Sequence, residues 1–174
     1  MNMKKGFTLI ELLIVIAVLG ILAAGLLAAV DPFEQLKKGR DTSTRNVVVE
    51  LHNAVIRYFG EHGDSPWFDS SACNSGALSK ASVASLSECI KNLEDDGELK
   101  EGFIDNLGDV ADKIFVTSPT SGSVTVCYSP TSRSQFKDDA NKFDQGGVNV
   151  ASTTCSKSAK EDMTPGDTCF WCAK

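Results

Sequence analysis

Histidine is scarce in this chain of 174 residues, which contains only His52 and His62. The chain also lacks a His-Glu-x-x-His motif, a Gly-Lys phosphate-binding loop and a recognisable set of nucleophile and base. These absences argue against the common zinc enzymes and nucleotide-binding enzymes. We expect no enzymatic activity, and we expect the two lone histidines to lie in the core or on the surface without a metal.

Positive charge is missing from a long early stretch, because no Lys, Arg or His lies between Gly6 and Lys37. Residues 1–60 carry seven Lys/Arg and five Asp/Glu, whereas residues 61–174 carry ten and eighteen. An acidic C-terminal part lacks the clustered cations that neutralise phosphates. Nucleic acid is therefore not expected as the main partner.

The stretch 7–30 has only Thr8 and Glu11 as clearly polar members. As a helix, 24 residues reach about 36 Å, which is enough to cross a hydrocarbon core of about 30 Å. Lys4 and Lys5 precede this stretch and favour a cytoplasmic N-terminus. We expect a single-pass precursor in the cytoplasmic membrane. An uncut anchor is one alternative, and an ordinary signal peptide is another, although only 23–25 loosely fits its cleavage site.

Glu11 is a carboxylate inside this apolar stretch, where a charge costs roughly 2.5–3.5 kcal/mol. Such a group should have a partner. One candidate cation arises if the chain is cut after Gly6, because the new amine of Phe7 lies one helical turn before Glu11. The pair can close within one chain or between two neighbouring chains.

The segment Lys5-Gly6-Phe7-Thr8-Leu9-Ile10-Glu11, with the apolar residues that follow it, resembles the processing site of type IV pilins and pseudopilins. The resemblance implies a prepilin leader at residues 1–6, cleavage after Gly6 by a prepilin peptidase and N-methylation of Phe7. It also implies a salt bridge between Glu11 and the Phe7 amine of an adjacent subunit. The filament-core helix would be 7–30.

The resemblance implies an α+β pilin fold, in which the second half of a long N-terminal helix packs on a small antiparallel sheet with short helices. It implies a structural subunit of an extracellular filament. The partners would be other copies of the chain, an inner-membrane assembly platform and minor pilins. A pseudopilin of a type II secretion or DNA-uptake system is an alternative, and a membrane-tethered binding or thiol-redox domain is a more distant one.

Many members of this family carry a proline within the second half of the apolar segment, but the first proline here is Pro32. Gly20 and Gly25 are the expected weak points instead, since each costs about 1 kcal/mol relative to Ala in a helix. Local melting of the helix in a filament is expected between Gly20 and Pro32.

An amphipathic continuation of the helix is predicted over 31–62. Its apolar residues recur every three to four positions, at Val47/Val48, Leu51, Ala54/Val55 and Tyr58/Phe59. Gly60, Gly63 and the following Asp64-Ser65-Pro66-Trp67 predict its end.

A globular head is predicted over 63–174. A loop near 69–79 should lead to a short helix over 83–93 with Ser79 or Ser82 as N-cap, and 99–107 should form another helical turn. The β-type runs 113–117 and 123–128 predict a hairpin. A last strand is expected at 167–172 after a polar stretch.

All six cysteines lie in the head, and their even number in an exported region favours disulfides. The cysteines are Cys73, Cys89, Cys127, Cys155, Cys169 and Cys172. The sequence does not choose among the pairings; we favour Cys73 with Cys89, and Cys127 and Cys155 with the two C-terminal cysteines. Redox activity or zinc binding of Cys169-x-x-Cys172 is the alternative.

No cofactor is expected, but one acidic loop is a weak calcium candidate. It contains Asp138, Asp139, Asn141 and Asp144. The spacing misses the EF-hand pattern, because Phe143 stands where an oxygen is needed. A solvated acidic loop is the favoured interpretation.

Overall fold

The computed structural model describes residues 6–29, 31–69, 73, 75–166 and 168–174. The chain divides into two compact units, 1–36 and 37–174. Most of the predicted leader, residues 1–5, lies outside the described residues.

The first unit is dominated by helix α1 (Leu9–Ala29). Its large apolar side chains are all exposed, from 48% at Val15 to 78% at Leu9. Within the described residues, one helix is long and apolar enough to cross a membrane, over Leu9–Leu27. A helix that is apolar on every side has no solvated face, so it needs lipid or other protein around it.

Helix α1 passes through Gly20 and Gly25 without interruption. A methyl group added at either glycine would meet no atom within 4 Å. The predicted long helix is nevertheless divided, because α1 ends at Ala29 and α2 (Pro32–His62) begins three residues later. Local melting at the two glycines within a filament stays a prediction.

Asp31 explains why a new helix begins at this place. Its Oδ1 accepts hydrogen bonds from the backbone N–H groups of Phe33 (3.1 Å) and Glu34 (3.3 Å). Asp is a preferred N-cap, and Pro32 occupies the first helical position, where its missing N–H costs nothing. The Asp31-Pro32 step is therefore a helix start.

The apolar stripe of α2 packs into the head as predicted. Val48, Leu51 and Ala54 are fully buried, and Val55 and Tyr58 nearly so. Gly63 follows the helix with φ +81°, and its N–H donates to Phe59 O at 2.9 Å. A left-handed residue after the last turn favours glycine, so the predicted end of the helix is confirmed.

The sheet has four antiparallel strands in the order β1-β2-β3-β4. They are β1 (Leu78–Ser82), β2 (Ile114–Ser118), β3 (Thr125–Tyr128) and β4 (Trp171–Ala173). Val116 pairs with Val126 in the β2–β3 hairpin, which the sequence predicted. The α+β class with a small antiparallel sheet is confirmed.

Strand β1 was not predicted, since part of it was assigned to the loop near 69–79. Its sequence is Leu-Ser-Lys-Ala-Ser, and its pairing with β2 is irregular between Leu78 and Ala81. Lys80 sits in that irregularity with φ +55°. Such a segment has weak strand propensity, so its conformation comes from pairing with a distant strand.

Short helices accompany the sheet. The predicted helix around 83–93 is a 3-10 turn, η1 (Val83–Leu86), followed by α3 (Ser87–Asp95). Ser82 precedes it but makes no side-chain cap bond. The predicted turn at 99–107 is α4 (Phe103–Leu107), which continues into η2 (Gly108–Lys113). Two further helices in the polar stretch, α5 (Arg133–Phe136) and α6 (Ala159–Asp162), were not predicted.

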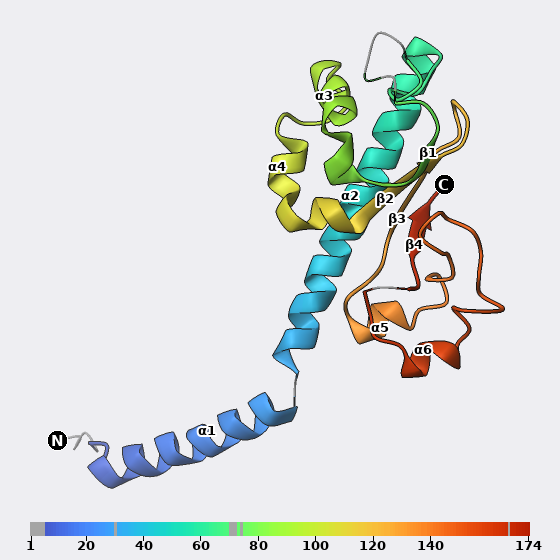
Figure 1. The fold of residues 1–174 in the computed structure, drawn as a ribbon. Coiled ribbons are helices and arrows are strands. Elements are labelled where there is room, and N and C mark those ends of the chain that lie inside the picture. The colour runs from blue at the N-terminus through green and yellow to red at the C-terminus, as the bar shows by residue number, and fades with distance from the viewer. Residues whose placement is uncertain (1–5, 30, 70–72, 74, 167) are drawn as a thin grey trace. The chain divides into compact units, whose positions relative to one another are not determined.

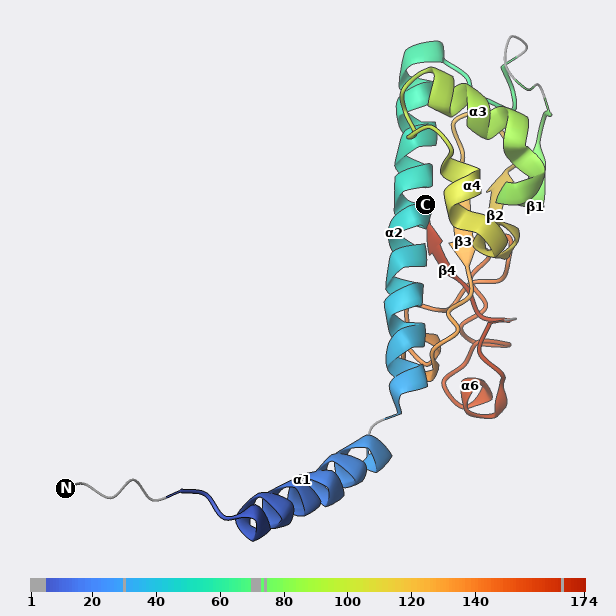
Figure 2. The ribbon, with the colours of Figure 1, turned by 90° about the vertical axis from the view of Figure 1, so that its left-hand side faces the viewer.

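The main core lies between α2, the sheet and α3. Within the second unit, α3 lies towards the C-terminal end of α2, whereas α5 and α6 lie towards its other end (Figure 1, Figure 2). A small separate cluster of Phe136, Cys155 and Cys169 supports the α5–α6 region. A polar stretch without a long apolar pattern is thus held by a disulfide and one aromatic ring.

Candidate functional site

The predicted scissile bond joins Gly6 to Phe7 in backbone that is not helical. Both residues are exposed, and Phe7 keeps 83% of its surface accessible. A Cβ at position 6 would meet no atom within 4 Å. The fold of this chain therefore places no steric demand for glycine here.

Thr8 and Glu11 form a cap at the first turn of α1. Glu11 Oε2 accepts hydrogen bonds from Thr8 N (2.9 Å) and Thr8 Oγ1 (2.8 Å), and Glu11 N donates to Thr8 Oγ1 (3.3 Å). This reciprocal pattern is a capping box, which satisfies N–H groups that a helix start leaves unpaired.

The capping box adds partners that the sequence analysis did not consider. The sequence offered the Phe7 amine, formed on cleavage, as a cation for Glu11, and Thr8 hydrogen-bonds Glu11 already in the uncut chain. Both of these bonds reach Oε2. The pair of Phe7 and Glu11 stays a prediction, since the amine exists only after cleavage.

The six cysteines form three disulfides, Cys73–Cys89, Cys127–Cys172 and Cys155–Cys169. These are the favoured pairs, with the two C-terminal cysteines now assigned. Cys127 and Cys172 are register partners on neighbouring strands β3 and β4.

The Cys169-x-x-Cys172 segment does not form a bond within itself. Cys169 is fully buried and Cys172 is 9% exposed, and each is bonded to a distant cysteine. Residues three apart in extended backbone point to opposite sides, as expected. The arrangement is that of two structural crosslinks.

Three of the weak calcium candidates, Asp138, Asn141 and Asp144, form hydrogen bonds with the backbone of their own loop. Asp138 Oδ1 accepts from Ala140 N at 2.8 Å. Asp144 Oδ1 accepts from the N–H groups of Gly146 (2.9 Å) and Val148 (2.8 Å). The buried Asn141 amide donates to the carbonyls of Gln135 and Phe136. Across the described residues, no group of three or more His, Cys, Asp or Glu is placed to hold a metal ion.

Asp41 is a buried carboxylate that the sequence analysis missed. It lies in α2 and is 3% exposed. It accepts bonds from Thr131 N (2.9 Å), Thr131 Oγ1 (2.8 Å) and Ser132 N (2.7 Å). Charge-assisted bonds of this kind fix the segment after β3 to the helix. Nothing local in the sequence marks this aspartate, because its partners lie 90 residues away.

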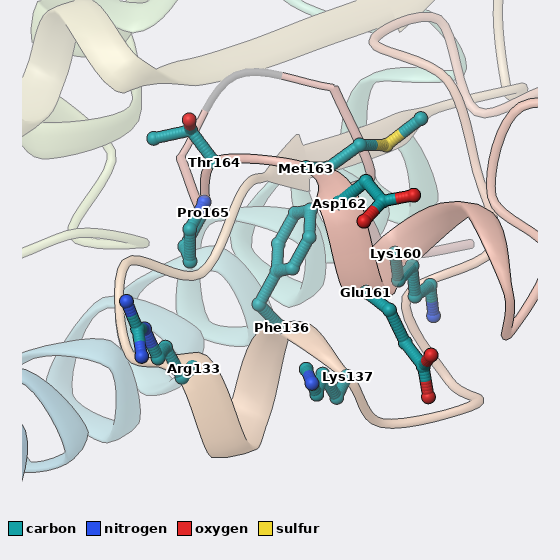
Figure 3. Close-up of a pocket in the computed structure, with 9 residues that line it drawn as sticks. All are labelled: Arg133, Phe136, Lys137, Lys160, Glu161, Asp162, Met163, Thr164 and Pro165. Atoms are coloured by element: carbon teal, nitrogen blue, oxygen red, sulfur yellow. The ribbon is translucent and has the colours of Figure 1, made fainter.

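A cavity of about 340 Å³ lies between α5 and the segment containing α6 (Figure 3). Phe136 lines it, together with side chains that carry charges of both signs. Lys160 is 2% exposed and donates to Asp138 O at 2.6 Å; burial lowers the pKa of its ammonium. The mixture of charges selects no class of ligand.

Comparisons with known proteins agree with the N-terminal motif. Residues 1–27 match the family model of the prokaryotic N-terminal methylation motif. The chain is similar to a fimbrial protein of Neisseria meningitidis serogroup B, with 35% identity over 104 residues, 59% of this chain and 54% of that protein.

A second fimbrial protein, from Neisseria meningitidis serogroup A / serotype 4A, is 41% identical over 72 residues, which are 41% of each chain. The matches thus span about half the length of these curated relatives. No solved structure matches the chain. The predicted resemblance to type IV pilins is therefore confirmed by the N-terminal methylation motif at residues 1–27 and by the fimbrial relatives.

Proposed function

We propose that this chain is a structural subunit of a type IV pilus or pilus-like filament, assembled through its N-terminal helix. The observation that carries the proposal is the methylation motif joined to a helix whose large apolar side chains are all exposed. That surface must be covered by lipid before assembly and by other copies afterwards. The head has its own core and disulfides, so it does not need the filament to fold.

Processing begins with cleavage after Gly6. A prepilin peptidase would add water across the Gly6–Phe7 amide, giving a carboxylate on Gly6 and an amine on Phe7. The chain itself leaves space for a side chain at position 6, so the demand for glycine would come from the peptidase. Methylation would then move one methyl group from a sulfonium methyl donor to the Phe7 amine, with loss of a proton.

Assembly would use the new amine. Glu11 Oε2 is held by Thr8 in its own chain, and Oε1 would accept from the Phe7 amine of an adjacent copy. This contact removes two charges from an apolar environment at once and selects copies inserted at the matching height. The precursor would lie in the cytoplasmic membrane with its N-terminus inside. An assembly platform and minor pilins would act on the mature form.

Intact mass and N-terminal peptide mapping test this proposal on protein purified from cells that express the full chain. We expect a mature form that begins at N-methylated Phe7, and we expect Gly6→Val to accumulate as uncut precursor. The matched control is Gly39→Val, a glycine of α2 where an added Cβ also meets nothing within 4 Å. Wild-type protein that keeps residues 1–6 while performing its normal task would refute the proposal.

The same material separates a pilus subunit from a pseudopilin. A pilus subunit should be abundant in filaments sheared from the cell surface, with the mature N-terminus. A pseudopilin should have that N-terminus but remain in the membrane fraction. No enzymatic step by the chain itself enters either scheme.

A further inference from the structure

The residue at which α1 begins determines whether the Gly6–Phe7 bond lies inside or outside the helix. The helix starts at Leu9, and Leu12 N donates to Thr8 O at 3.3 Å. The Gly6 carbonyl therefore lies two residues before the Thr8 carbonyl, in exposed backbone outside the helix. A peptidase can reach such a bond without first unfolding a helical turn.

An apolar environment favours a longer helix, because every backbone N–H left unpaired in lipid costs several kcal/mol. If the helix began at Phe7, the Gly6 carbonyl would accept a bond from Ile10 N, as an N-cap carbonyl does. The carbonyl to be attacked would then be occupied within the helix. Something must stop the helix before it reaches this bond.

The capping box supplies that stop. Thr8 Oγ1 accepts from Glu11 N, and Glu11 Oε2 accepts from Thr8 N and Thr8 Oγ1. We propose that Thr8, acting through this cap, is a positioning residue for processing: it makes α1 begin at Leu9, after the scissile bond, and keeps Gly6–Phe7 in accessible non-helical backbone. This inference rests on the proposed cleavage after Gly6.

A cap series at position 8 tests the proposal on the full-length precursor in detergent micelles with a purified prepilin peptidase. Ser and Asn are good N-caps, whereas Val has the shape of Thr but no hydroxyl. We expect Thr8→Ser and Thr8→Asn to be cleaved at the wild-type rate and Thr8→Val to lose about fivefold in kcat/KM. Thr44→Val is the matched control, since Thr44 Oγ1 bonds Arg40 O within α2, far along the chain from the cut.

A second readout separates positioning from direct contact with the peptidase. The ¹³C chemical shifts of Gly6 and Phe7 in micelles report whether the helix has grown over them. We expect helical shifts in Thr8→Val and extended-backbone shifts in Thr8→Ser and the wild type. Slow cleavage of Thr8→Val without growth of the helix would mean that the peptidase contacts Thr8 itself, and would overturn the proposal.

The remaining outcomes are also decisive. Cleavage of Thr8→Val at the wild-type rate, or Thr8→Ser as slow as Thr8→Val, overturns the role of the cap but leaves processing after Gly6 intact. Wild-type precursor that is not cut between Gly6 and Phe7 overturns the proposed function instead. The two failures are distinguished by the mass of the wild-type product.

Discussion

The two units of this molecule differ in whether the chain itself covers their apolar surface. In the second unit the apolar stripe of α2 is covered by the chain's own sheet and short helices, and Val48 and Leu51 are fully buried. In the first unit α1 covers none of its apolar surface, and even its least exposed large side chain, Val15, is 48% exposed. The apolar face of α2 is covered by other parts of the same chain, whereas the apolar surface of α1 needs a second molecule to cover it.

This difference separates stability from assembly. Substitutions in the head should change the free energy of unfolding, since the groups they touch are buried in one copy. Substitutions in α1 should leave that free energy unchanged and alter insertion or assembly. A substitution in one unit that altered the property assigned to the other would break this separation.

The largest expected effect is loss of filaments in Glu11→Gln. Glutamine keeps the capping box, so cleavage after Gly6 should proceed. The amide cannot neutralise the Phe7 amine of another copy, so assembly should stop. Electron microscopy of sheared surface material and the mass of the membrane-bound protein measure both outcomes.

Glu11→Asp is the matched variant, because it keeps the charge on a shorter side chain and should retain some filaments. Normal filaments in Glu11→Gln would remove the electrostatic account of assembly, and the first unit would then need another source of specificity.

A pair of leucine truncations compares the two units directly. Leu51 is fully buried in the second unit, and Leu51→Ala should destabilise that unit by about 2–5 kcal/mol through lost transfer energy and a cavity. Leu13 is 51% exposed on α1, and Leu13→Ala should leave the head unchanged. Urea unfolding of the full mature chain in detergent, followed by near-ultraviolet circular dichroism, measures both. Equal losses of unfolding free energy in Leu51→Ala and Leu13→Ala would show that the two units unfold together.

Features that follow from local pattern could be predicted from the sequence. The stripe containing Leu51 depends only on helical spacing, and the hairpin depends on two β-type runs and a turn. The capping box was also readable, because Thr8-x-x-Glu11 precedes an apolar run. A charge in an apolar stretch indicates the need for a cation, and this interpretation leaves out the free N–H groups of a helix start, to which the Glu11 carboxylate also bonds.

Features that depend on distant partners could not be predicted. β1 has weak strand propensity and takes its conformation from β2. Asp41 looks like any polar residue of an exposed helix face until the segment after β3 is placed beside it. A similar limit applies to α1. Its exposed apolar surface indicates that a partner is needed, but it does not indicate the shape of that partner.

Asp41→Asn should destabilise the head by about 1–3 kcal/mol. The carboxylate accepts from Thr131 N and Ser132 N, and an amide would place an N–H group against one of these donors. Thr131→Val, which removes only the hydroxyl bond to Asp41, should cost less. Unfolding in urea measures both. If Asp41→Asn lowers the free energy of unfolding no more than Thr131→Val does, the buried charge contributes little to stability.

The smallest effect concerns the only two tyrosines of the chain, Tyr58 and Tyr128, which both lie in the second unit and are each 3% exposed. Burial raises the pKa of Tyr128 to about 12, and Asp41 adds to this rise. Burial, followed by the hydrogen bond to Asp69, raises the pKa of Tyr58 to about 12. An unfolded tyrosine ionises near pH 10.

The folded head therefore binds more protons than the unfolded chain between about pH 10 and about pH 12. By linkage, this contribution to stability is fully present below pH 10 and is lost as the pH rises through that window. Tyrosinate absorbance should appear near pH 12 in folded protein and near pH 10 in urea. Tyr58→Phe should halve the signal without moving the Tyr128 transition. Because α1 contains no tyrosine, this titration reports on the second unit alone. Tyrosinate that forms near pH 10 without urea would show that the two tyrosines are not buried in the folded protein.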